Sequence, residues 1–273
     1  MSAYPNNIQL GIWLDDLRLG VKQGLKAIES LHLEAVGLDA FSADLSPRTL
    51  GQSGRRDLGQ FVRARGATLT AMRADVGARR LADSNSLDVN LSMIREAMQF
   101  AADLSVSQIV VPCGYVPAVD DKDGARTRAT LCEAAKTLAM FSSNLGVRVC
   151  WLSGGEAPET LASFLNEVET GGLLEVDLNP GAYVMRGIDP LKALQSLSSR
   201  VGMARAVDHY RGGAEAPFGK GDVRWGEVLI GLSTLQRNKP ISMLAGCTLD
   251  GDRLLALSNA YRAMQQLRAN PLG

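Results

Sequence analysis

The stretch LCEAAKTLAMFSSNLGVRVCWL, residues 131–152, joins a helix pattern to a strand pattern. In its first part, apolar side chains recur every three or four residues, at Leu131, Ala135, Leu138, Phe141 and Leu145. This is the spacing of one face of an α-helix. Gly146 follows where such a helix is expected to end, and Val147–Leu152 is a short apolar run typical of a buried strand. The stretch therefore predicts the helix-then-strand unit of an α/β fold.

The same alternation extends along the chain. Seven further runs are predicted strands: Ile8–Trp13, Ala35–Leu38, Thr68–Met72, Gln108–Val111, Leu174–Leu178, Val201–Val207 and Pro240–Leu244. Helix-spaced apolar positions return at Leu87, Leu91, Ile94, Met98 and Ala101, and again at Leu254, Leu257, Tyr261, Met264 and Leu267. Gly66, like Gly146, stands just before a strand, where a helix C-cap belongs, and Asp250 is the expected N-cap of the last helix.

Eight strand–helix units in 273 residues have the number and the length of one (β/α)8 TIM barrel. We expect residues 1–273 to form this single α/β domain, because no linker rich in Pro or Ser divides them. A doubly wound open sheet is the alternative. Its dinucleotide-binding form is not supported, since Trp13 is followed by Leu14-Asp15-Asp16-Leu17 and not by a G-x-G-x-x-G turn.

Composition excludes several classes of protein. The 29 basic residues balance 29 acidic ones, which argues against a nucleic-acid binder or a polybasic membrane protein. The pairs Arg55-Arg56 and Arg79-Arg80 are interpreted as the start of a solvated helix and as a loop. No apolar run approaches the roughly 20 residues of a membrane span, and residues 1–7 lack the form of a signal peptide. Four dispersed cysteines without a C-x-x-C pair fit a reduced, cytoplasmic protein.

The predicted strand at 174–179 divides cleanly by chemistry. Its apolar residues alternate with Glu175, Asp177 and Asn179, so the polar side chains share one face. In a barrel the apolar face packs on helices, and the polar face points inward. Functional residues of such barrels lie at the carboxyl ends of the strands. We therefore expect Asn179 and Asp177 to line a binding site, whereas Glu175 fits a hydrogen-bonded core layer equally well.

The next predicted strand carries Arg205 among apolar neighbours. A buried guanidinium needs a carboxylate or an anionic ligand, because an unpaired buried charge is costly. Asp177 or Glu175 on the preceding strand is a possible partner. Asp208 and His209 leave this strand at the presumed active face and are candidate catalytic residues, although an Asp–His pair at a strand end is often structural. The tryptophans Trp13, Trp151 and Trp225 are expected to pack in the core rather than stack on a ligand.

Three segments resemble the xylose isomerase-like TIM barrels, a superfamily of sugar-phosphate isomerases and epimerases that also includes the endonuclease IV enzymes. They are Leu178-Asn179-Pro180-Gly181, the strand from Arg200 to Asp208, and the loop from Ala216 to Trp225, which reads A-P-F-G-K-G-D-V-R-W. The P-x-G-x-G-D-V-x-W pattern of this loop is the most specific part. The likeness extends over about residues 8–245 and implies a small carbohydrate-like ligand at the carboxyl end of the barrel.

The resemblance also implies a divalent metal, which polarises a keto sugar while carboxylates move protons. The family holds this metal with Glu, Asp, His and Glu from strands five to eight. In this chain the corresponding positions are Leu152, Asn179, Arg205 and, within one residue, Leu244. Leucine and arginine offer no donor to a cation. We therefore expect the fold and its pocket, but neither the metal nor any other cofactor.

Two functions remain open. The first is a sugar isomerase/epimerase-like barrel that binds its ligand without metal. If it also converts the ligand, Asp208 and His209 are the proton-transfer groups and Arg205 stabilises an enolate. The second is a catalytically inactive pseudoenzyme with a binding or regulatory role. A DNA-repair endonuclease is disfavoured, because that branch uses a histidine-rich metal cluster and this chain has only His32 and His209.

Ligand charge is a further expectation from the sequence. Of the four positions equivalent to the metal ligands, only Arg205 is charged, and Lys220 and Arg224 stand where the family loop often has acidic residues. Arginine binds phosphate or carboxylate in bidentate geometry. These residues favour an anionic sugar, with Arg205 as its anchor. The alternative is that Asp177 or Glu175 neutralises Arg205 internally, which would leave the mouth of the barrel without excess positive charge.

Overall fold

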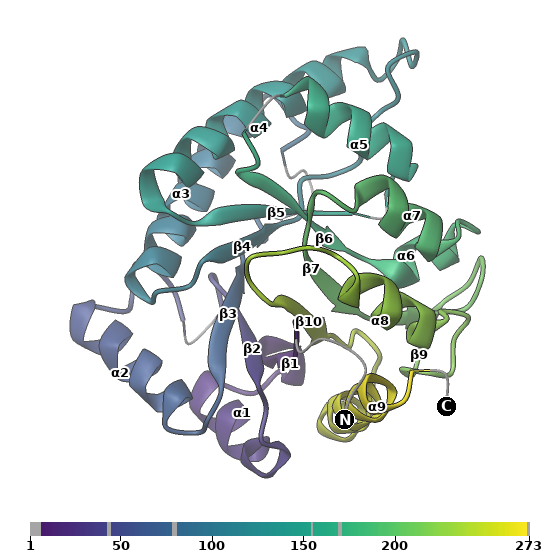
Figure 1. Ribbon diagram of the computed structural model, residues 1–273. Coiled ribbons are helices and arrows are strands. Elements are labelled where there is room, and N and C mark those ends of the chain that lie inside the picture. The colour runs from purple at the N-terminus through teal and green to yellow at the C-terminus, as the bar shows by residue number, and fades with distance from the viewer. Residues whose placement is uncertain (1–6, 43–44, 78–80, 154, 169–170, 272–273) are drawn as a thin grey trace.

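The computed structural model describes residues 7–42, 45–77, 81–153, 155–168 and 171–271. Residues 1–6 and Arg79-Arg80 therefore lie outside the described residues. Within them, parallel strands close into a barrel in the order β1-β10-β7-β6-β5-β4-β3-β2 (Figure 1). The strands are β1 (Ile8–Trp13), β2 (Ala35–Asp39), β3 (Thr68–Arg73), β4 (Gln108–Val111), β5 (Arg148–Leu152), β6 (Leu174–Leu178), β7 (Val201–Ala206) and β10 (Ile241–Ala245). The (β/α)8 TIM barrel is confirmed, the open sheet was wrong, and each strand lies within one residue of its predicted bounds.

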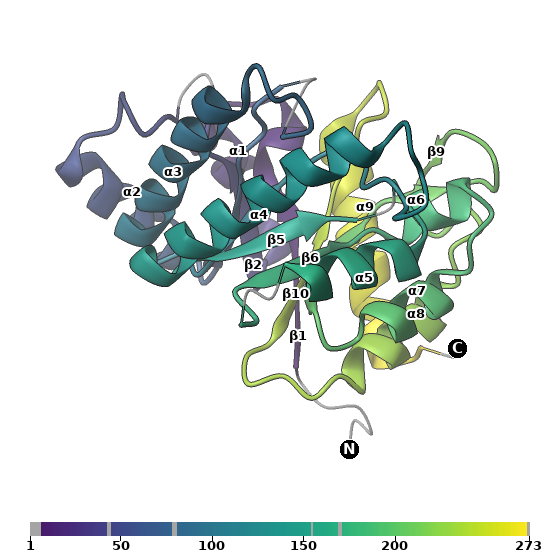
Figure 2. The same cartoon turned by 90° about the horizontal axis from the view of Figure 1, so that it is seen from above.

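The helices surround the barrel, as two perpendicular views show (Figures 1 and 2). They are α1 (Val21–Ala27), α2 (Gln52–Arg63), α3 (Leu87–Asp103), α4 (Ala125–Leu145), α5 (Pro158–Glu167), α6 (Pro180–Met185), α7 (Pro190–Leu197), α8 (Trp225–Ser233) and α9 (Arg253–Ala269). Short 3₁₀ turns follow β1 and α1, at Leu14–Leu17 and Glu29–Leu31, and β8 (Asp208–His209) pairs antiparallel with β9 (Glu215–Ala216). Among the described helices, none has both the length and the apolar character that crossing a membrane requires.

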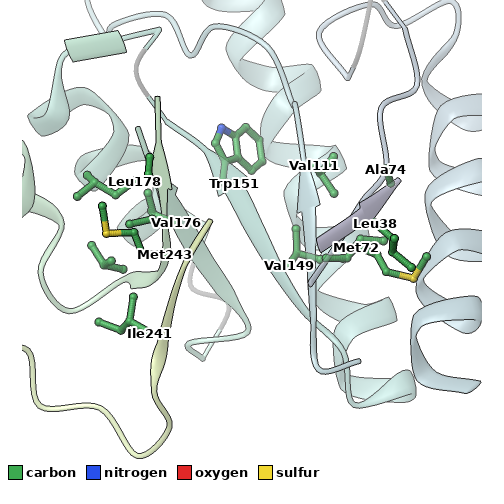
Figure 3. Packing of buried hydrophobic residues seen from close by; sticks show 14 of the residues in the cluster. Leu38, Met72, Ala74, Val111, Val149, Trp151, Val176, Leu178, Ile241 and Met243 are labelled. Atoms are coloured by element: carbon green, nitrogen blue, oxygen red, sulfur yellow. The ribbon is translucent and has the colours of Figure 1, made fainter. Parts of the chain in front are cut away.

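Two apolar layers stabilise the barrel. The larger one lies between strands and helices, and Figure 3 shows part of it, including Val149, Val176 and Met243. The smaller one fills the barrel interior and consists of Trp13, Ala35, Ala71, Val110, Cys150, Met203 and Leu244. On β6, Val176 belongs to the outer layer, whereas Glu175 and Asp177 point inward. The predicted division of β6 into two faces is confirmed.

Helix ends follow the predicted residues only in part. Gly146 is the C-cap of α4 and has a left-handed backbone with φ of 68°, as expected. Gly66 is also left-handed, but α2 ends earlier, with Ala64 as its C-cap. The N-cap of α9 is Asp252, whose carboxylate accepts a hydrogen bond from the Leu255 amide at 2.9 Å. The expectation for Asp250 was therefore wrong.

Two arginines at helix starts, Arg253 and Arg55, are largely buried, although the sequence predicted a solvated position for Arg55. Arg253, at the start of α9, donates to the carbonyl oxygen of Cys247 at 2.6 Å and faces the barrel together with Leu257. Leu254, predicted to lie on that face, is exposed instead. Arg55 is paired with Asp103 of α3 and donates to the Leu50 carbonyl at 2.8 Å, so it links α2 to α3 rather than pointing into solvent.

Candidate functional site

At the carboxyl end of the barrel, the first three strands bring an arginine and two aspartates together. Arg73 ends β3 and Asp39 ends β2, while Asp16 lies in the 3₁₀ turn after β1. The Arg73 Nε and Nη2 atoms lie 2.6 and 2.8 Å from the two Asp39 oxygens, and Nη2 is also 3.0 Å from Asp16. This bidentate geometry is the strong form of a guanidinium–carboxylate pair.

A second guanidinium–carboxylate pair joins β7 to the neighbouring strand β6. The Arg205 Nη2 and Nε atoms lie 3.0 and 3.3 Å from the Asp177 Oδ2 atom. Asp177 is fully buried, and burial raises the pKa of its carboxyl even though Arg205 lowers it. Its Oδ1 atom is buried without a hydrogen-bond partner among the described residues. Of the alternatives for Arg205, the structure favours internal pairing with Asp177.

Trp13 connects the two pairs. The guanidinium carbon of Arg73 is 5.1 Å from the centre of the Trp13 ring, and that of Arg205 is 5.6 Å from it. Both distances are in the range of cation–π attraction. Trp13 itself is fully buried, so its indole supports the two guanidiniums and is not available to stack on a ligand. The two arginine side chains are 16% and 12% exposed and remain accessible at the mouth.

The positions equivalent to the family's metal ligands do not fit a metal. Leu152 pairs in register with Asp177, and Leu244 with Arg205, so that two leucines and a guanidinium lie at this level of the barrel. Asn179 caps α6, with its side-chain oxygen accepting from the Ala182 amide at 3.2 Å. In the part of the chain that the structure describes, no group of three or more His, Cys, Asp or Glu side chains is arranged to hold a metal ion.

Asp208 holds the loop that carries the family-like pattern. Its Oδ2 atom accepts hydrogen bonds from the amides of Gly219 and Gly221 at 2.9 and 3.1 Å and from the Trp225 indole at 3.0 Å. Its Oδ1 atom accepts from the amides of His209 and Val223 at 2.9 and 3.3 Å. The buried Asp208 carboxylate thus accepts hydrogen bonds from five N–H groups. The arrangement favours a structural role over the proton transfer expected from the sequence.

Among the described residues, no hydrogen bond joins the His209 imidazole to the Asp208 carboxylate. The contact between these two residues is made by the His209 backbone amide and not by its imidazole ring. The ring lies beside Gly181 in α6, where a side-chain carbon on Gly181 would come within 2.7 Å of the His209 Nδ1 atom. This Nδ1 atom is buried and has no hydrogen-bond partner among the described residues. His209 therefore packs against the start of α6.

The two cationic residues of the loop before α8, Lys220 and Arg224, do not cluster with Arg205. Arg224 is about half exposed and forms ion pairs with Asp189 at 3.3 Å and with Glu227 at 2.9 Å. These partners belong to the N-terminal ends of the outer helices α7 and α8. Lys220 is exposed, and no ion pair links it to another described residue. The cationic cluster expected from Arg205, Lys220 and Arg224 is thus dispersed over separate parts of the molecule.

A cavity of about 400 Å³ adjoins the Arg73 cluster and includes Asp15, Asp39 and Ser42 in its lining. Burial raises the pKa of Asp15 to about 6, and the nearby Asp39 carboxylate acts in the same direction. Asp15 also accepts a hydrogen bond from the Asp39 amide at 2.7 Å. The Asp15-Asp16 pair directly after the first strand is the one sequence signal for this cluster, since two adjacent carboxylates follow a predicted strand end.

Glu156 is a second carboxyl group with an unusual environment. It lies in the loop between β5 and α5 and is 2% exposed. Burial raises its pKa to about 7, although the backbone amides of Val116 and of Glu156 itself and the Arg186 guanidinium act against this shift. Neither carboxylate oxygen has a hydrogen bond of ordinary geometry among the described residues. Nothing in the residue pattern distinguishes Glu156 from a surface loop glutamate.

Solved structures with the same architecture cover nearly the whole chain. A xylose isomerase domain protein from Planctomyces limnophilus has a TM-score of 0.76 at 19% identity, with 98% of both chains covered. A sugar phosphate isomerase/epimerase from Parabacteroides distasonis has a TM-score of 0.71 at 12% identity, covering 97% of this chain and 98% of that one. A probable 3-DHS dehydratase from Bacillus anthracis has a TM-score of 0.75 at 11% identity, with 94% and 98% covered.

No protein-family model matches the sequence, and neither does any curated protein. At these low identities the structural likeness shows the fold. The chain therefore has the TIM-barrel fold of these structures, which is the fold that the sequence resemblance implied.

Proposed function

We propose that the protein binds a small carbohydrate-like molecule at the carboxyl end of its barrel and does so without a divalent metal. The fold supports this proposal, because the similar structures include a sugar phosphate isomerase/epimerase and a xylose isomerase domain protein. In barrels of this kind, ligands bind at this end. The four unpaired cysteines fit a reducing, cytoplasmic setting for such a protein.

The observation that carries the proposal is the arrangement of Arg73 and Arg205 over Trp13. Each guanidinium has N–H donors left after pairing with its aspartate, and the aspartates have acceptor positions left as well. Neighbouring donors and acceptors at a concave mouth match the hydroxyl groups of a sugar, each of which donates one hydrogen bond and accepts others. In this arrangement, guanidinium groups supply the positive charge that the family obtains from a metal.

The charge balance favours a neutral ligand over the anionic one expected from the sequence. Asp177 compensates Arg205, Asp39 compensates Arg73, and Asp16 adds a further negative charge. An anionic sugar at this mouth would face excess carboxylate. We therefore propose a polyhydroxylated ligand without phosphate or carboxylate as the preferred one.

Conversion of the ligand without metal requires a group that exchanges protons near neutral pH. Asp15 fits this requirement better than Asp208, because its pKa is about 6 and it lines a cavity beside the arginine cluster. The alternative is a pseudoenzyme that binds without chemistry. The saturated hydrogen bonding of Asp208 favours that alternative, since one of the two expected proton-transfer groups is committed to the loop.

Calorimetric titration with neutral ketoses and with matched sugar acids and sugar phosphates tests the proposal. We expect neutral sugars to bind at least as tightly, with no change on adding a chelator. Arg73→Met/Asp39→Asn should weaken binding, whereas Arg224→Met, which removes an outer arginine, should not. Tighter binding of the anionic sugars, or binding that requires an added cation, would overturn it. Turnover lost in Asp15→Asn with binding retained would distinguish an enzyme from a pseudoenzyme.

A further inference from the structure

The amino-terminal end of the barrel contains a buried ion cluster that is separate from the mouth. Glu175, near the start of β6, is 3% exposed. It accepts a hydrogen bond from the Gln108 side chain at 3.0 Å and pairs with Arg148 at 3.1 Å and with Arg237. Gly202 on β7 leaves room for it, since a side-chain carbon there would lie 2.3 Å from a Glu175 oxygen. Three strands and the loop before β10 thus converge on one carboxylate.

This cluster forms the floor of a cavity of about 230 Å³, whose lining includes Arg148, Arg237, Lys239, Gln108 and Glu175. The lining contains three cations and a single carboxylate, which leaves an excess of two positive charges. Among the described residues, Lys239 has no ion pair, and Arg148 is 30% exposed. The nearest contacts to Glu175 are made by Nη1 of Arg148 and Nη2 of Arg237, and Nη1 of Arg237 also donates to the Ser199 carbonyl at 3.3 Å. Each guanidinium carries five N–H donors, so donors remain on both.

We propose that this basal cavity binds a small molecule bearing a phosphate dianion. Two guanidiniums held by one buried carboxylate are oriented before a ligand arrives, which reduces the entropy lost on binding. Arginine matches phosphate in bidentate geometry, and lysine adds a mobile third charge. The excess charge of the lining equals the charge of a phosphate monoester above its second pKa. The cavity is large enough for a phosphate group with a short organic substituent and too small for a nucleotide chain.

Glu175 orients the two arginines and does not contact the ligand in this proposal. Without it, two guanidiniums and a lysine would repel one another at the closed end of the barrel. Its burial beneath the cavity therefore explains why an acidic residue lies at the centre of an anion site. This site does not depend on the proposed function of the mouth, because its lining includes none of the residues invoked there.

Calorimetry at pH 8, with inorganic phosphate and with phenyl phosphate at constant ionic strength, tests the proposal. We expect saturable binding of one phosphate per chain. Arg148→Met should weaken it by about 10-fold or more, since a hydrogen bond to a charged group is lost. Lys239→Met should weaken it by about threefold. Lys22→Met, the same charge change on α1, and Arg205→Met/Asp177→Asn at the mouth should leave the affinity unchanged.

Lys239→Met should not affect folding, because Lys239 has no contact in the buried cluster of Glu175 with Arg148 and Arg237. Tighter binding of phenyl phosphate than of inorganic phosphate would identify an organic phosphate as the ligand, and equal binding would identify free phosphate. Absence of saturable binding at millimolar phosphate, or equal weakening by Lys22→Met, would overturn the proposal. So would a short oligonucleotide that binds the same lysine and arginine more tightly than either phosphate.

Discussion

Arg205 on β7 and Asp177 on β6 form an ion pair inside the barrel, with the Arg205 Nη2 atom 3.0 Å from the Asp177 Oδ2 atom. Asp177 has no exposed side-chain surface, and Arg205 is 12% exposed. A pair with this degree of burial makes each partner dependent on the other, because either charge left alone would lose both its solvent and its counterion. It also includes Arg205, one of the four positions that the sequence resemblance aligns with metal ligands.

Substituting one partner of this pair should lower the free energy of unfolding more than substituting both partners together. We expect Arg205→Met to lower the free energy of unfolding by about 3 to 5 kcal/mol, because Asp177 is then buried without a partner. Arg205→Met/Asp177→Asn should recover most of this loss. Urea denaturation of the two variants measures the difference. Arg224→Met removes an exposed arginine and serves as the control, with an expected change within about 0.5 kcal/mol. Equal destabilisation by the single and double variants would contradict the coupling.

The Asp208 carboxylate should stabilise the loop whose amides donate hydrogen bonds to it, that of Gly219, Gly221 and Val223. Asp208→Asn replaces one acceptor oxygen with an NH2 group that faces backbone N–H donors, and we expect a loss of about 1 to 3 kcal/mol. Hydrogen exchange of the amides of Gly219, Gly221 and Val223 should become faster. Asp222→Asn is the matched control, because Asp222 lies in the same loop and its side chain accepts one hydrogen bond from the described residues, that of the Arg211 amide. Unchanged exchange in Asp208→Asn would show that this carboxylate does not hold the loop.

The buried carboxyl of Glu156 predicts a pH dependence of stability. Its pKa is about 7 in the folded protein, against an ordinary value of 4.5, so the folded state binds more protons between these values. Stability therefore falls as the pH rises from about 4.5 to 7 and stays reduced above pH 7. Glu156→Gln removes this penalty, and we expect it to raise the free energy of unfolding at pH 8 by about 1 to 3 kcal/mol.

The same variant should have little effect at pH 4, where the carboxyl is protonated in both states. Because Asp15 and Asp177 also have raised pKa values, the comparison is between the wild type and the variant at each pH, measured by urea denaturation. Glu133→Gln changes an exposed glutamate on α4 and should show no such pH-dependent gain. A gain of equal size at pH 4 and pH 8 would mean that Glu156 does not titrate in this range.

Metal removal should leave the protein unchanged. The positions Leu152, Asn179, Arg205 and Leu244 provide no set of donors for a cation. We expect purified protein to contain no stoichiometric divalent metal by mass spectrometry, and a chelator to leave the thermal unfolding midpoint unchanged. Stoichiometric metal whose removal lowers this midpoint, with recovery on adding back one particular cation, would contradict the prediction.

The sequence predicted the elements of the barrel because their signals are local. The apolar spacing of α3 and α4 and the alternation along β6 depend on neighbours within a few residues, and every strand was located to within one residue. The same alternation placed Asp177 on the inner face, and the need of a buried guanidinium for a counter-charge made Asp177 or Glu175 a possible partner of Arg205. The end of α4 at Gly146 is local in the same way, because only its own backbone must become left-handed.

Local pattern could not show which charges meet across the barrel. Arg73, Asp39 and Asp16 come from three different strand ends, and nothing in their own surroundings in the sequence pairs them. Arg253 replaces Leu254 on the buried face of α9 because carbonyl oxygens of a preceding loop satisfy its guanidinium. The position of Arg224 outside the mouth likewise depends on how Asp208 folds the loop before it.

The amino-acid sequence by itself determined which residues form strands and helices and which side of each strand is polar. Only the tertiary structure decided that Arg205 is neutralised by Asp177, that Arg73 and Arg205 share Trp13, and that Glu156 is buried. The physical reason is how far apart along the chain the interacting residues lie. Periodicity acts between residues a few positions apart, whereas burial and ion pairing depend on the closure of the barrel, which brings strand ends together that are far apart along the chain.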